Sequence, residues 1–135
     1  MKALDTNVLV RLLLADDPKQ LEQVQALLSQ KQIYTAPISV MLELVWVLEG
    51  QDFDVLQIGA AFNRLLALPN FKPTHLAELR QALTWYGKGM DFADAVHLAL
   101  STEAKQLLTF DKTFIKIAKR EGLSEAGVAW VAEVV

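Results

Sequence analysis

The sequence contains no cysteine, only two histidines and no long uninterrupted apolar run. Without cysteine the chain has no disulfide, no thiol nucleophile and no ligands for a zinc ribbon, and it suits a reducing compartment. The longest apolar run, residues 38–48, is interrupted by Glu43 and is shorter than the roughly 20 residues that a membrane-spanning helix needs. Because Met1 and Lys2 lead straight into a strand-like segment, we expect no signal peptide, no membrane attachment and a cytoplasmic location.

Charge is also sparse, since charged residues are 21% of the 135 residues and the net charge is −3. A chain with a net negative charge is not a general electrostatic binder of nucleic acid. If bound cations neutralise several carboxylates, however, the remaining surface is close to neutral and suits a nucleic-acid substrate bridged by cations. The 53% hydrophobic content supports a substantial core, and the length predicts a single domain over residues 1–135.

Short apolar segments alternate with segments of helical periodicity. We expect strands at residues 2–4, 33–35, 71–72, 106–110 and, in an ambiguous tail, 128–131. We expect helices at residues 7–14, 18–30, 37–49, 54–68, 75–86, 91–103 and 111–121, with Thr74 as the cap of the helix that begins at His75. This alternation predicts an α/β fold with a short, mostly parallel sheet of about four or five strands covered on both faces.

Acidic residues follow two of the predicted strands and open one helix. Asp5 ends the first strand, Asp111 follows the strand 106–110, and Asp91 and Asp94 stand at N-cap and N3 spacing. Open α/β sheets place their chemistry at the carboxyl ends of strands. Each of these acids also suits a helix N-terminus, where it stabilises the helix by roughly 1 kcal/mol, so for each acid taken singly capping alone is the favoured interpretation.

Glu43 stands in the middle of a predicted helix, where it cannot be a cap. Apolar residues flank it on every face in the segment SVMLELVWVL. A helix that is apolar all round is usually buried, and burial of an isolated carboxylate is costly. This pattern favours a functional carboxylate; a buried ion pair or a narrow solvent-facing strip of helix is the alternative.

If these acids converge, their charges need a partner. Two unit charges about 4 Å apart repel by roughly 4 kcal/mol at an effective dielectric constant near 20. A set of oxygen ligands favours Mg²⁺ or Mn²⁺ over zinc. Such a site can activate water for attack on a phosphodiester and stabilise the leaving oxygen.

Four short motifs occur in an order that resembles a known family. DTNVL at Asp5, LELV at Glu43, FADAVHLA around Asp94 and LLTFDKTF around Asp111 resemble PIN-domain ribonucleases. More narrowly, they are similar to VapC-type toxins of type II toxin–antitoxin pairs, over essentially the whole chain. The resemblance implies a PIN-like three-layer α/β/α domain with Mg²⁺- or Mn²⁺-dependent endoribonuclease activity that leaves a 5′-phosphate.

The same resemblance implies the site and the partners. The catalytic metal ligands would be Asp5, Glu43, Asp94 and Asp111. The protein would form a homodimer and would be held inactive by a cognate VapB-type antitoxin, whose C-terminal segment occupies the acidic groove.

Several residues are predicted to support this site. By the resemblance, Asn7 supports the first acid, and Thr109 is the small hydroxyl residue two positions before the last acid. Thr6 is interpreted as a turn residue that bonds the backbone. Asp91 is interpreted as an N-cap, with contact to a metal-bound water as the alternative. His97 shares a helix face with Asp94 and is interpreted as a partly buried helix residue, with a role beside the metal ligands as the alternative.

Two cations and one aromatic residue are weaker candidates. Arg11 lies one turn beyond Asn7 and could contact an RNA phosphate, although a solvated helix residue is an equal interpretation. Lys112 begins a basic side of the last helix that could guide RNA, although such charge usually serves solvation. Trp46 is expected in the core or a dimer interface.

Two other functions remain open. Asp5-Thr6-Asn7 loosely matches the first motif of Mg²⁺-dependent phosphatases of the haloacid dehalogenase type, which needs a second Asp where this chain has Asn7. A non-catalytic receiver-like or degenerate PIN module would use the acids to bind a partner. Receiver domains carry an acidic pair after the first strand, whereas here Asp5 stands alone.

Overall fold

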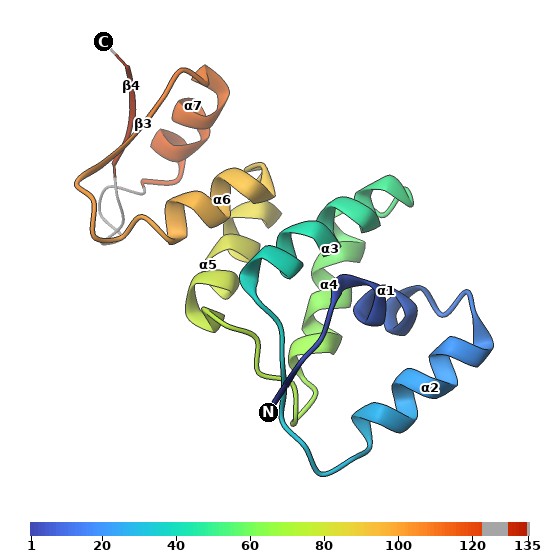
Figure 1. Cartoon of the computed structure of the whole chain (residues 1–135). Coiled ribbons are helices and arrows are strands. Elements are labelled where there is room, and N and C mark those ends of the chain that lie inside the picture. The colour runs from blue at the N-terminus through green and yellow to red at the C-terminus, as the bar shows by residue number, and fades with distance from the viewer. Residues whose placement is uncertain (123–129, 135) are drawn as a thin grey trace. The chain divides into compact units, whose positions relative to one another are not determined.

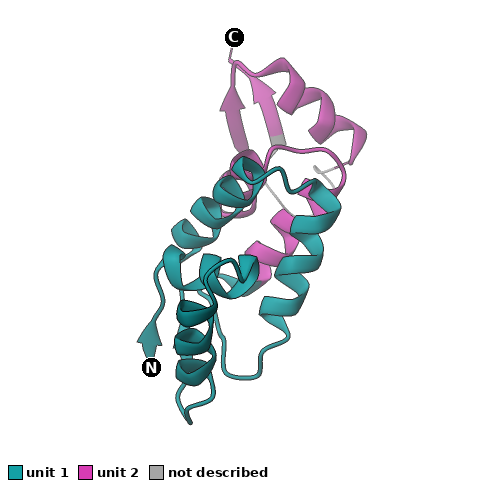
Figure 2. Cartoon of the chain, turned by 90° about the vertical axis from the view of Figure 1, so that its right-hand side faces the viewer, with its two compact units in different colours: residues 1–76 teal, residues 77–135 magenta. Residues whose placement is uncertain are grey.

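The computed structural model describes residues 1–122 and 130–134 of the chain. The chain divides into two compact units, Met1–Leu76 and Ala77–Val135 (Figure 2). In the described residues, no helix is long and apolar enough to cross a membrane.

The first unit carries two short parallel strands and four helices. Figure 1 labels these helices α1 to α4. Its elements are β1 (Lys2–Ala3), α1 (Thr6–Leu14), α2 (Pro18–Leu28), β2 (Tyr34–Thr35), α3 (Ile38–Gly50) and α4 (Val55–Leu66). β1 pairs with β2 in the register Lys2↔Tyr34 and Ala3↔Thr35. The apolar faces of α1, α3 and α4 supply fully buried side chains, which include Leu9, Met41, Leu44, Leu48, Ile58, Phe62 and Leu65.

Side chains cap the helices of the first unit, and the role of Thr74 differs from the sequence prediction. Thr74 was expected to cap the helix predicted to begin at His75. However, His75 adopts a left-handed φ of 53° and separates Thr74 from that helix. The Thr74 hydroxyl instead accepts a hydrogen bond from the backbone N–H of Ile38 at 3.0 Å. Pro37 precedes α3 and has no hydroxyl or carboxylate to offer. The prediction for Thr74 was therefore wrong: it caps a helix that lies 36 residues earlier.

The second unit contains the remaining elements. These are α5, which begins at the last residue of the first unit (Leu76–Gly87), α6 (Phe92–Ala99), β3 (Gln106–Thr109), α7 (Lys112–Arg120) and β4 (Trp130–Glu133). β3 and β4 pair in parallel, from Gln106↔Trp130 to Thr109↔Glu133. The strand predicted at 128–131 overlaps β4 at residues 130–131, and residues 128–129 lie outside the described residues.

The predicted α/β class with parallel strand pairing is confirmed. β1 pairs with β2 in the first unit, and β3 pairs with β4 in the second. The predicted strand at 71–72 contributes only a bridge from Phe71 to Tyr34. Pro73 follows directly and has no N–H to continue a ladder.

The predicted sixth helix also ends earlier than expected, at Ala99 instead of residue 103. The Ser101 hydroxyl donates to the His97 carbonyl at 2.6 Å. A serine side chain that binds the preceding helical turn competes with the backbone donors that would continue the helix.

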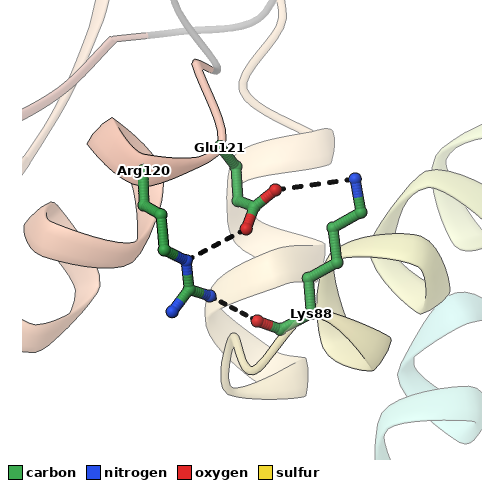
Figure 3. A network of polar contacts seen from close by, with 3 residues as sticks. All are labelled: Lys88, Arg120 and Glu121. Atoms are coloured by element: carbon green, nitrogen blue, oxygen red, sulfur yellow. Dashed lines mark hydrogen bonds and ion pairs between the residues drawn. The ribbon is translucent and has the colours of Figure 1, made fainter.

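A polar network joins the end of α7 to the loop after α5 (Figure 3). The Glu121 carboxylate accepts from Arg120 Nε at 3.1 Å and pairs with Lys88 Nζ at 3.5 Å. Arg120 also donates from Nη2 to the Lys88 carbonyl. Next to Lys88, Gly89 has a φ of 105°, which residues with a Cβ rarely adopt.

We predict that Glu121→Gln lowers stability by roughly 0.5–1 kcal/mol, because it keeps the side chain's size and removes its charge. The effect stays small since Lys88 and Arg120 are each 56% exposed, while Glu121 is 18% exposed. Urea unfolding at low and high salt measures it, with the exposed Glu103→Gln as the control. Equal stability of the two variants at low salt would contradict the prediction.

Candidate functional site

Asp5 leaves the carboxyl end of β1 and caps α1. The strand is held by a hydrogen bond from the Leu4 N–H to the Thr35 carbonyl at 2.8 Å. The exposed Asp5 side chain then accepts from the Thr6 N–H at 2.8 Å. The acid therefore lies at a strand end, as the sequence predicts, and it also fulfils the capping role that the sequence left open.

Thr6 is almost fully buried, with 2% of its surface exposed. We expected its side chain to bond the backbone, but its Oγ1 has no hydrogen-bond partner among the described residues. The Asp5 carboxylate already takes the Thr6 N–H, and an orphaned buried hydroxyl costs about 1–3 kcal/mol. The predicted hydrogen bond from the Thr6 side chain to the backbone is therefore wrong. The unsatisfied hydroxyl belongs to the residue that directly follows Asp5.

Asn7 and Arg11 extend from the next two turns of α1. Within the described residues, the exposed Asn7 amide makes no hydrogen bond to Asp5, and it lines a groove together with Arg11. Arg11 Nη1 forms an ion pair with Asp16 at 2.9 Å. Neither interpretation offered for Arg11 from the sequence anticipated this pairing.

Glu43 is exposed on α3, so the sequence reasoning from burial does not hold. The helix is not buried all round, because its core face carries Met41, Leu44, Val45 and Leu48 while Glu43 and Trp46 face solvent. Trp46, expected in the core or a dimer interface, is 75% exposed and therefore not part of the core. Glu43 therefore lies on a solvent-facing strip of helix, which was the alternative interpretation. Its carboxylate carries no desolvation cost that would mark it as functional.

The second unit gathers acids around Asp94. Asp94 lies half-buried in the first turn of α6, and the pKa of its carboxyl is raised by burial and by the charges of Asp91 and Asp111. The exposed His97 opposes this rise in pKa. The sequence analysis predicted a partly buried His97, and that prediction is wrong because the side chain is exposed. The four side chains form one electrostatic cluster in which negative charge dominates.

Backbone contacts position the acids of this cluster. Asp91 is the N-cap of α6, as its spacing predicts, and accepts from the Asp94 N–H at 3.1 Å. Asp111 caps α7 by accepting from the Phe114 N–H at 3.0 Å. Thr109 Oγ1 accepts from the Asp111 N–H, also at 3.0 Å. These bonds fix the chain direction at the end of β3 and the start of both helices.

The four acids predicted as metal ligands are thus divided between the units. Asp5 and Glu43 belong to the first unit, and Asp94 and Asp111 belong to the second. Among residues 1–122 and 130–134, no three acidic or imidazole side chains are close enough to ligate one ion directly. The cluster around Asp94 still fits a hydrated Mg²⁺ ion, which proteins usually bind through one or two carboxylates while it keeps several waters.

The basic side chain of Lys112 is exposed at the first residue of α7, directly after Asp111. Two exposed lysines, Lys116 and Lys119, follow on the same helix. A cation beside an acid cluster can draw a polyanionic substrate toward it.

The sequence from residue 2 to residue 120 matches the PIN domain family. The chain belongs to this family. The match spans most of both units and includes all four predicted acids. PIN domains are generally nucleases that use divalent metal ions, and the α/β/α fold class implied by the resemblance is confirmed. Among curated proteins, none matches the sequence.

The structure adds two polar residues that the sequence analysis did not connect with a site. Gln20 and Gln23 lie on α2 and line the same groove as Asn7 and Arg11. Their spacing of three places them on one helix face, which was the signal available in the sequence. That signal is shared by many solvated helix faces and identifies no groove by itself.

Proposed function

We propose that this PIN domain is a Mg²⁺- or Mn²⁺-dependent endoribonuclease and the toxin of a VapBC-type toxin–antitoxin pair. The observation that carries the proposal is the carboxylate cluster around Asp94 in a chain of a nuclease family. Two neighbouring acids, Asp91 and Asp111, raise the pKa of Asp94, and His97 lowers it. A bound cation would neutralise this excess of negative charge.

Asp94, Asp111, Asp5 and Glu43 are the residues proposed to hold the metal ion. When bound, a divalent cation lowers the pKa of water and stabilises negative charge on a phosphodiester. Asp91 and Thr109 position this set through the backbone bonds described above.

The proposed partners follow from the resemblance and from exposed surface. A VapB-type antitoxin and a second copy of the chain are the partners that VapC-type proteins imply. The exposed Trp46 supports such contacts, since large aromatic residues are enriched in protein interfaces. The cytoplasm is the proposed location, because it holds the RNA and suits a chain without cysteine.

Two other functions receive less support. The PIN match favours a nuclease over a phosphatase of the haloacid dehalogenase type, whose first motif lacks its second Asp here. It also favours a nuclease over a receiver-like module. A degenerate PIN domain usually lacks an acid, whereas this chain retains all four.

The test is RNA cleavage by purified protein that is free of any co-expressed partner. We expect site-specific cleavage of at least one structured RNA, tRNA included, in Mg²⁺ or Mn²⁺, and at least a 100-fold loss of rate in EDTA. The melting temperature should also rise when Mn²⁺ is added, because the ion binds the folded chain. The absence of cleavage of every RNA tested, together with no Mn²⁺-induced rise in melting temperature, would contradict the proposal.

A further inference from the structure

A groove of about 330 Å³ runs between α1 and α2 in the first unit. Its floor is apolar and consists of Val8, Val24 and Leu27. This volume lies at the lower end of the roughly 300–1,000 Å³ typical of small-molecule sites. The groove therefore suits one compact ligand with an apolar body.

Three amide side chains on the groove, those of Asn7, Gln20 and Gln23, make no hydrogen bond within the described residues. Gln20 is half of a capping box: its N–H donates to Asp17 at 3.0 Å, while its side chain does not return a bond and lines the groove. A complete capping box does form at Asp54 and Gln57, so the open geometry at Gln20 is not general in this chain. Each free amide offers both a donor and an acceptor.

The charge of the groove suits an anionic ligand. Its lining contains one cation, Arg11, and no carboxylate. Asp16 takes the Nη1 of Arg11, and the guanidinium has further N–H groups. Apolar side chains, donor–acceptor amides and one cation with further N–H groups together match a nucleobase attached to a phosphate.

One residue of the groove is close in sequence to an acid of the candidate site. Asn7 lines the groove and lies two residues from Asp5, in the first turn of α1. We propose that the α1–α2 groove binds one nucleotide of single-stranded RNA through the amides of Asn7, Gln20 and Gln23. This inference rests on the proposed ribonuclease function and assigns it a specificity-determining subsite.

The test is a nucleotide titration followed by NMR, on the full chain with Asp94→Asn to prevent cleavage. The probes are the four nucleoside 5′-monophosphates and a short single-stranded oligoribonucleotide. At least one nucleotide should shift backbone amide signals of α1 and α2. In the double variant Gln20→Ala/Gln23→Ala the dissociation constant should rise by about 10-fold, which corresponds to about 1.4 kcal/mol.

The chain offers a matched control on the same helix. Gln25→Ala removes an exposed amide of α2 that is not part of the groove. Alanine is the best helix former, so both variants should keep the melting temperature of their parent. The Gln25→Ala protein should bind the nucleotides as its parent does.

Several results would overturn the subsite. In the titration, no shift of any backbone amide signal, or shifts only outside α1 and α2, would contradict it. So would equal dissociation constants for the double variant and its parent, or binding of an amphipathic peptide to the groove in place of nucleotides. Failure of the nuclease is separable. RNA cleavage at unchanged rate and position by Gln20→Ala/Gln23→Ala would reject the subsite alone, whereas nucleotide binding without any metal-dependent cleavage would reject the nuclease alone.

Discussion

Asp94→Asn is expected to reduce metal-dependent RNA cleavage by about 1,000-fold, equivalent to about 4 kcal/mol of activation free energy. Asparagine keeps the shape of the side chain but removes the charge at the centre of the acid cluster. Cleavage of the same RNA by wild type and variant, at equal Mg²⁺, measures the loss. Glu103→Gln, which removes an exposed acid of the same unit, should leave cleavage unchanged.

The substitution Asp94→Asn should also slightly stabilise the metal-free protein. The pKa of Asp94 in the folded chain lies above its ordinary value of 3.8, so the charged form opposes folding at neutral pH. That cost disappears as the pH falls through the raised pKa, because the folded protein then binds the proton. In EDTA we expect Asp94→Asn to melt about 1–3 °C higher near pH 7.5, since solvent screens a half-exposed group, and the gain to shrink toward acidic pH.

Added Mn²⁺ should reverse the order of the two melting temperatures, so that wild type melts above Asp94→Asn. Wild type gains stability from the bound ion, whereas the variant lacks a ligand and gains less. A variant that cleaves RNA normally, or that shows the same Mn²⁺-induced rise as wild type, would remove Asp94 from the metal site.

Asp5→Asn is expected to lower cleavage by about 100- to 1,000-fold without changing the melting temperature by more than about 2 °C. Asparagine caps helices about as well as aspartate, and its side-chain oxygen accepts from the Thr6 N–H in the same way. Only the charge needed for a cation is lost. Asp5→Ala should lose both functions, with a stability cost of roughly 1 kcal/mol.

This pair of variants separates the two roles that the sequence left open for Asp5. Asp52→Asn is the matched control, because Asp52 is exposed and its φ of 62° is one that asparagine tolerates. Normal cleavage by Asp5→Asn, combined with a lower melting temperature of Asp5→Ala, would show that Asp5 is a cap only.

Local features were within reach of the sequence because each depends on neighbouring residues. The N-caps at Asp5 and Asp91 and the start of α2 at Pro18 follow from short-range sterics and backbone hydrogen bonds. The order and spacing of the four motifs carried the resemblance to PIN domains, and the family match over residues 2–120 confirms that part of it. These features need no knowledge of which distant segments meet.

Features that depend on distant segments were decided by the tertiary structure. Thr74 caps α3 because its loop passes the start of that helix, and no local pattern reports this. Glu43 faces solvent because the core is on the opposite side of α3, although its sequence neighbours are apolar on all sides. The charge on Asp94 is disfavoured by burial, by the neighbouring Asp91 and by Asp111, which follows 17 residues later in the sequence. Burial and charge repulsion act through space, so only the folded chain determines them.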